Sequence, residues 1–339
     1  MTDDQQLIEA PDSGGMSGGA PTTEGRNERR EFFRAALGAA AVTAAGASAL
    51  AIATSASAAV IADNEMLRYL TQLDYLAAQF FSFATTGAGL PAALLTGQTA
   101  DVSGSATGAR QVTFTDPVVA QYAAEITQDL TANITWLRTQ LGADGIVAQP
   151  AIDLGTAATG AFSTFARAAG IVATGASFDP YSSDANFLLA AFMFEDVIVT
   201  AYLDAVPRIA DKAVLAGITA ILATHSHHAA VIRALLYAKG VATPTLRTNA
   251  DAISGVRDNL DGVPGIDDHG ISPVTITTDT VLKNTIVSNI APVAPNGSII
   301  GRLPGTVLNI LYLSSTAVSS GGFFTAGING TTIKSSSAH

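Results

Sequence analysis

The chain has 339 residues, no cysteine, 13% charged residues and a formal net charge of −11. Without cysteine there are no disulfides, thiolate metal sites or iron–sulfur clusters, and 17 Lys and Arg residues are too few for the clustered positive charge of a nucleic-acid-binding protein. The mean hydropathy of +0.35 is high for a soluble protein, so a membrane or export segment has to be considered first.

The N-terminal region, 1–58, has the pattern of an export signal. Residues 1–25 are polar and rich in Gly, Ser and Thr, which predicts disorder. Two adjacent arginines then precede an aromatic residue and an uncharged Ala-rich run, a pattern that resembles twin-arginine signals, with a small-residue cleavage site before residue 59. We predict transport by the twin-arginine translocase to the periplasm or cell envelope; a basic amphipathic tail and an uncleaved anchor are the alternatives. The residues behind this prediction are Arg29, Arg30, Phe32, Ala56 and Ala58.

Four later segments have helical periodicity with start or stop signals. Asp116 followed by Pro117 is a helix start, and Gly142 and Gly240 follow the ends of two periodic segments. The expected helices cover 63–84, 116–141, 184–206 and 211–240.

The connections between these helices predict the topology. The second connection, 143–183, is long and contains an expected short helix near 157–168, whereas the third is short. Two helical hairpins joined by a long crossover are the layout of ferritin-like bundles. We therefore predict an all-α, ferritin-like four-helix bundle over 59–240. Residues 241–339 are rich in Thr, Ser, Gly and Pro, which predicts a loop-rich extension packed on the bundle, with one short helix after Pro304.

Four polar residues interrupt the apolar stripes of three helices. Asp74 and Glu195 each lie 11 residues after the start of their helix, and His225 lies 14 after Asp211. In antiparallel helices of similar length these positions meet near the middle of the bundle, and the i, i+3 spacing puts His228 on the same face as His225. A buried carboxylate has to be protonated, paired or bound to a metal. The sequence therefore predicts a buried polar site.

Several short motifs follow one another in a specific order and spacing. They are NFLL (186–189), FEDV (194–197), TAY (200–202), HAAVIR (228–233), RDNLDG (257–262), PGTVLNILY (304–312) and GGFF (321–324). Together they resemble the ferritin-like proteins related to plant desiccation-related proteins, many of whose bacterial members carry export signals. The resemblance covers nearly all of the chain after the predicted signal.

The resemblance implies a di-metal site with Glu on the first and third helices and Glu-x-x-His on the second and fourth. On the second helix Leu130 and Asn133 stand at the two ligand positions, so that pair is lost. A bridged di-iron centre needs about four carboxylates, and this chain offers two at the matching positions. The residues left for a metal are Asp74, Glu195, His225 and His228.

Three hypotheses of function follow. The first is a non-catalytic, stress- or desiccation-related exported protein with a degraded di-metal site, in which a charged histidine paired with a carboxylate replaces the metal. The second is a protein or oxidoreductase that binds a single Fe, Mn or Zn ion through the remaining ligands. The third is an envelope surface-interaction protein that works through 241–339. The sequence favours the first.

Three further expectations concern other parts of the chain. Glu195 and Asp196 interrupt the apolar segment 187–206, so no permanent membrane span is expected. The sequence is compatible with a homo-oligomer and does not determine the number of chains. Four aspartates lie among glycines but lack the spacing of an EF-hand, which favours an acidic turn over a calcium site. They are Asp258, Asp261, Asp267 and Asp268.

Overall fold

The computed structural model describes residues 63–262, 268–277, 279–294 and 296–338. The predicted export signal, including Arg29, Arg30, Phe32, Ala56 and Ala58, lies outside the described residues.

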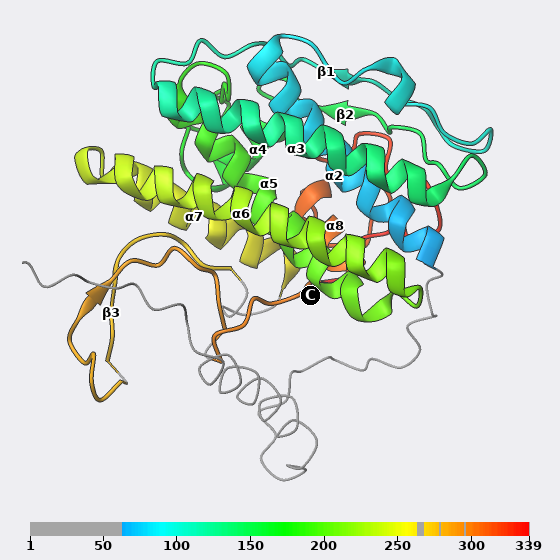
Figure 1. Cartoon of the computed structure of the whole chain (residues 1–339). Helices are drawn as coiled ribbons and strands as arrows, with labels where there is room; N and C mark the ends of the chain where they lie inside the picture. Colours follow the sequence, from blue (N-terminus) through cyan, green and yellow to red (C-terminus); the bar gives the residue numbers. More distant parts are fainter. Residues whose placement is uncertain (1–62, 263–267, 278, 295, 339) are drawn as a thin grey trace, which may run out of the picture. The chain divides into compact units, whose positions relative to one another are not determined.

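Four long helices form the bundle, as Figure 1 shows. They are α2 (Asp63–Thr86), α3 (Pro117–Leu141), α5 (Asp184–Ala205) and α6 (Lys212–Ala242). Helix α2 packs along α3 and α5 packs along α6, so the two predicted hairpins are present. The two aspartates predicted to start helices cap them. The Asp116 carboxylate accepts a hydrogen bond from the Val118 amide, and the Asp211 carboxylate accepts hydrogen bonds from the amides of Ala213 and Val214. The predicted all-α ferritin-like bundle is confirmed.

The long crossover between the hairpins is also present. It contains β2 (Ile152–Asp153) and α4 (Ala161–Ala168), and β2 pairs in parallel with β1 (Ala106–Thr107) from the α2–α3 connection. That connection also contains the 3-10 helix η1 (Ala92–Leu94), whereas only η2 (Val206–Arg208) separates α5 from α6.

The extension after residue 240 begins with a helix that the sequence analysis did not predict. Helix α6 continues to Ala242, and α7 (Thr245–Asp261) follows and packs on α5 and α6. Gly240 does not end α6; it lets α7 approach, because a Cβ there would lie 2.4 Å from Arg247 Cγ. Gly262, with φ of 73°, ends α7 instead.

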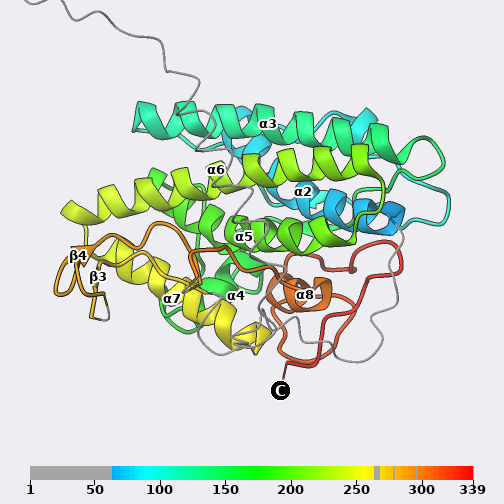
Figure 2. The same ribbon diagram turned by 60° about the horizontal axis from the view of Figure 1, so that its bottom comes forward.

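The rest of the extension is mostly irregular and packs on one side of the bundle (Figure 2). Strands β3 (Val274–Thr275) and β4 (Ile286–Val287) form an antiparallel pair. The predicted helix after Pro304 is present as α8 (Pro304–Tyr312), which packs against α5 and α7. The extension therefore contributes two helices to the core in addition to loops.

Helix α5 lies at the centre of the molecule. An aromatic cluster surrounds it, in which the Phe80 ring of α2 stacks on the Phe187 ring with centroids 5.3 Å apart. Two helical stretches of the described residues, 184–208 and α6, are long and apolar enough to span a membrane. In the most apolar part of each, 89% of the first stretch and 33% of the second are buried inside the fold. The first has the burial of a core helix. The absence of a permanent membrane span stays a prediction.

Candidate metal centre

The four polar residues predicted to meet lie together at the centre of the bundle. Helix α2 contributes Asp74, α5 contributes Glu195, and α6 contributes His225 and His228, and all four side chains are buried. The similar depths counted along the sequence therefore correspond to one site in three dimensions.

His225 lies between two carboxylates. Its Nδ1 is 3.0 Å from Glu195 Oε1, and its Nε2 is 3.2 Å from Asp74 Oδ1. The same Asp74 oxygen accepts a hydrogen bond from the Tyr202 hydroxyl at 2.9 Å. Burial is the main cause that raises the pKa of Tyr202 well above its usual value, and nearby Asp74 adds to it, so this hydroxyl stays a donor. Asp74 thereby fixes the His225 ring.

His228 has a similar arrangement, through a residue that the sequence did not reveal. Its Nδ1 is 3.4 Å from Glu195 Oε1, and its Nε2 is 3.1 Å from Oδ2 of Asp129 on α3. Asp129 is partly exposed at the edge of α3, next to the apolar position Leu130. In both histidines Nδ1 therefore faces the same Glu195 oxygen, and Nε2 faces an aspartate.

Helix α3 provides no ligand inside the bundle. Leu130 is fully buried at one of the two lost ligand positions. Asn133 occupies the other, and its buried Nδ2 has no hydrogen-bond partner among the described residues. An apolar side chain on this side and two carboxylates at the centre do not fit a bridged pair of metal ions, which takes carboxylates from all four helices.

The charges of the buried groups are strongly coupled. Burial by itself favours neutral His225, but the charges and hydrogen bonds of Asp74 and Glu195 outweigh it and raise the pKa of His225 to about 10. Burial likewise opposes ionisation of Glu195, but His225 and His228 outweigh it and lower the pKa of Glu195 to about 2. With protein groups alone, the site therefore holds an imidazolium between two carboxylates.

The donor atoms also fit a single metal ion. Glu195, His225 and His228 each offer one ligand atom, and these atoms all lie within 4.8 Å of one another. Two buried atoms of this set, Glu195 Oε2 and His228 Nδ1, have no hydrogen-bond partner among the described residues. Two imidazoles and one carboxylate are a ligand set for Fe(II), Mn or Zn. The residues thus fit one ion and do not fit two.

The acidic turn lies apart from this site. Asp261 Oδ2 is 2.7 Å from Arg302 Nε, and Asp268 Oδ1 is 2.8 Å from Arg257 Nε. These two carboxylates are occupied by guanidinium groups, which supports the acidic-turn interpretation over a calcium site. Asp267 lies outside the described residues.

Comparison with known proteins gives a family match and two relatives. Residues 62–238 match the family model of the ferritin-like domain. The chain is 25% identical over 277 residues to the ferritin-like catalase Nec2 of Nesocodon mauritianus, covering 79% of this chain and 84% of that protein. It is 28% identical over 217 residues to the desiccation-related protein PCC13-62 of Craterostigma plantagineum, covering 62% of this chain and 65% of that protein. No solved structure matches the chain. The predicted resemblance to desiccation-related ferritin-like proteins is confirmed.

Proposed function

Because the chain belongs to the ferritin-like domain family, we propose that it is a stress- or desiccation-related ferritin-like protein that binds one divalent transition-metal ion at the bundle centre. The ligands would be Glu195, His225 and His228. One observation carries this proposal: the Nδ1 atoms of both histidines face Glu195 Oε1, while each Nε2 faces an aspartate.

That orientation is typical of histidines that bind metals. A ligating imidazole usually donates its other ring N–H to a carboxylate, which fixes the tautomer and turns the lone pair toward the ion. Asp74 would hold the proton on Nε2 of His225, and Asp129 would hold it on Nε2 of His228. The Tyr202 hydroxyl, which donates to Asp74, would in turn fix that carboxylate.

The chemistry available depends on the metal. A bound Fe or Mn ion would supply redox chemistry, and Zn would supply Lewis-acid chemistry. One relative is named as a catalase, so hydrogen peroxide is the first substrate to test. Access is most direct from the α3 side, because Asp129 is 40% exposed whereas His228 behind it is 5% exposed.

The titration of His225 supports a second candidate, the non-catalytic protein. With a pKa near 10, His225 stays protonated at neutral pH in the metal-free protein and balances Asp74 and Glu195. In this second candidate the imidazolium replaces the metal for good, and the bundle has only a structural role.

Calorimetric titration of the chelator-treated protein with Mn(II) and Zn(II) at pH 7 separates the two candidates. We expect one ion to bind per chain and about one proton to be released, because His225 has to lose its proton before it can bind a metal. Repeating the titration in two buffers of different ionisation enthalpy measures that proton. If neither Mn(II) nor Zn(II) binds, only the non-catalytic candidate remains.

We also propose export by the twin-arginine route, on the basis of the N-terminal pattern. Replacement of both Arg29 and Arg30 by lysine should keep the precursor in the cytoplasm, whereas Arg26→Lys should not. Fractionation of a bacterial host, with the mass of the protein in each fraction, measures the location and the cleavage site. Equal periplasmic amounts of the double variant and the control would contradict this route.

A further inference from the structure

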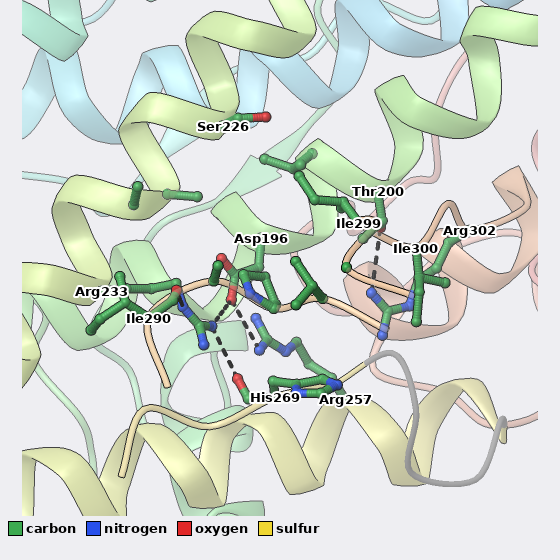
Figure 3. Close-up of a pocket in the computed structure, with 17 residues that line it drawn as sticks. Asp196, Thr200, Ser226, Arg233, Arg257, His269, Ile290, Ile299, Ile300 and Arg302 are labelled. Atoms are coloured by element: carbon green, nitrogen blue, oxygen red, sulfur yellow. Dashed lines mark hydrogen bonds and ion pairs between the residues drawn. The ribbon is translucent and has the colours of Figure 1, made fainter. Parts of the chain in front are cut away.

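A cavity of about 310 Å³ lies apart from the metal centre, on the side of α5 and α6 that faces α7 and the segment 290–302 (Figure 3). Asp196, Ser226 and Ala229 line it, and each follows a residue of the metal centre by one position. One residue along a helix corresponds to a rotation of about 100°. The cavity and the metal centre are therefore on different faces of the same two helices.

The walls of the cavity are mainly apolar. Its volume lies at the lower end of the range for small-molecule sites, about 300–1,000 Å³. Such walls favour a compact apolar body, because burying it removes apolar surface from water. The apolar lining includes Val199, Ala229, Ala230, Ile290, Pro292 and Val293.

The polar group that sets the chemistry of the cavity is the Asp196 carboxylate. Its side chain is only 7% exposed. Its Oδ2 accepts from Arg233 Nη1 at 2.8 Å and from Arg257 Nη2 at 3.3 Å, as the dashed lines of Figure 3 show. Oδ1 accepts no hydrogen bond from the part of the chain that the structure describes. Asp196 thus brings one acceptor atom without a hydrogen bond to a cavity whose walls are mainly apolar.

The guanidinium of Arg233 has no donor left for a ligand. Its Nε donates to the Ile290 carbonyl, and Nη1 donates to Asp196 and to the His269 carbonyl. Both donors of Nη2 go to the carbonyls of Gly270 and Asn289. An anionic ligand would therefore meet the Asp196 carboxylate without gaining a hydrogen bond from Arg233.

A cationic ligand is disfavoured as well, because two guanidinium groups already share Asp196. We propose that this cavity binds a small neutral alcohol or phenol, whose hydroxyl donates to Asp196 Oδ1 and whose apolar body contacts the α6 and 290–293 walls. A hydroxyl matches the one free acceptor without adding charge to a cluster whose charges are already paired.

Calorimetry with the full chain tests this proposal, with p-cresol as the probe and toluene and p-toluate as matched compounds. We expect p-cresol to bind at one site per chain. Toluene and p-toluate should each bind at least about tenfold more weakly. Toluene loses a hydrogen bond to a charged group, and the negative charge of p-toluate is repelled by the Asp196 carboxylate. Equal or tighter binding of either compound, or no binding of p-cresol, would overturn the assignment.

Two variants locate the binding site without disturbing the buried charges. Ala230→Phe fills the cavity from its exposed wall and should abolish p-cresol binding, whereas Ala234→Phe, at an exposed position of the same helix outside the cavity, should leave it unchanged. His228→Ala should also leave p-cresol binding unchanged, so this result does not depend on the metal proposal. Loss of binding in Ala234→Phe or His228→Ala, or its retention in Ala230→Phe, would place the probe elsewhere.

Discussion

The fold contains two buried clusters of charge, and they are built in different ways. The arginine cluster ties α6, α7 and the segment around residue 302 to three aspartates, and each guanidinium has a carboxylate oxygen within 2.8 Å. The histidine cluster lies at the bundle centre. Among the described residues, three of its buried atoms have no hydrogen-bond partner, against one, Arg257 Nε, in the arginine cluster. The arginine cluster is Arg233, Arg257 and Arg302 with Asp196, Asp261 and Asp268; the histidine cluster is Asp74, Asp129, Glu195, His225 and His228.

The difference indicates different roles. In the arginine cluster, the guanidinium of Arg233 also binds the carbonyls of residues 269, 270, 289 and 290, so it fastens the extension to the bundle. A cluster in which each guanidinium is paired with a carboxylate in this way maintains structure. The unpaired acceptors and the free ring nitrogen of the histidine cluster are instead the atoms that a metal ion uses. The predictions below test this contrast.

The largest effect is expected from Arg233→Ala. This change leaves Asp196 with one guanidinium and four backbone carbonyls without their donor, so the free energy of unfolding should fall by about 3–5 kcal/mol. Arg110→Ala removes an exposed pair with Asp179 and should cost less than about 1 kcal/mol. Urea unfolding of both variants measures the difference. Equal small losses would mean that the arginine cluster does not hold the extension in place.

The second effect is the pH dependence of the metal-free protein. The pKa of His225 is raised from 6.5 to about 10, so its contribution to stability is complete below pH 6.5 and is lost as the pH rises through 10. The pKa of Glu195 is lowered from 4.5 to about 2, so its contribution is complete above pH 4.5 and is lost as the pH falls toward 2. We expect the free energy of unfolding to fall by a few kcal/mol on the alkaline side.

Unfolding of the chelator-treated protein between pH 4.5 and 10 measures this profile, and His225→Ala should flatten its alkaline part. A profile that is the same in the variant would show that His225 does not carry the charge between Asp74 and Glu195.

Sequence patterns predicted the bundle because its signals are local. The N-cap Asp116, Pro117 and the final Gly142 mark α3 within 27 consecutive residues, and the structure places the helix between them. Helix α7 has a final glycine, Gly262, but no side chain that caps its start. Its buried positions Leu246, Ala250 and Ile253 include a small residue, and Thr, Asn and Gly surround them. Its helical state depends on packing against α5 and α6, which composition does not show.

The site was predicted only in part for a related reason. Asp74, Glu195, His225 and His228 stand on the apolar stripes, where a polar residue is conspicuous. Asp129 stands on the flank of α3, beside Leu130, and reaches His228 only because of the relative rotation of α3 and α6. The arginine cluster joins residues that are far apart in the chain, so no spacing in the sequence predicts it.

A moderate effect is expected from Asp129→Asn. The amide can donate to or accept from His228 Nε2 but no longer attracts its proton, so the affinity for Mn(II) or Zn(II) should fall about 10–100-fold. Glu125→Gln, one turn earlier on the exposed side of α3, serves as the control. Competition with a metal chelator measures both affinities. An affinity unchanged in Asp129→Asn would remove Asp129 from the site.

The smallest effect is expected from Tyr202→Phe. The change removes one buried hydrogen bond to Asp74 Oδ1 without removing the ring, so it should cost about 1 kcal/mol in the free energy of unfolding. Tyr122→Phe, at an exposed position of α3, should be neutral. If the two variants unfold alike, Tyr202 does not support Asp74.

The most direct test of the single-metal site is elemental analysis of the protein purified from metal-replete cells. We expect about one equivalent of Fe, Mn and Zn together in the natural chain and in His227→Ala, whose histidine is exposed on the opposite side of α6, and less than about 0.2 equivalents in His228→Ala. About one equivalent in all three proteins would place the metal elsewhere. Less than about 0.2 equivalents in the natural chain would leave the imidazolium of His225 as the permanent occupant of the bundle centre.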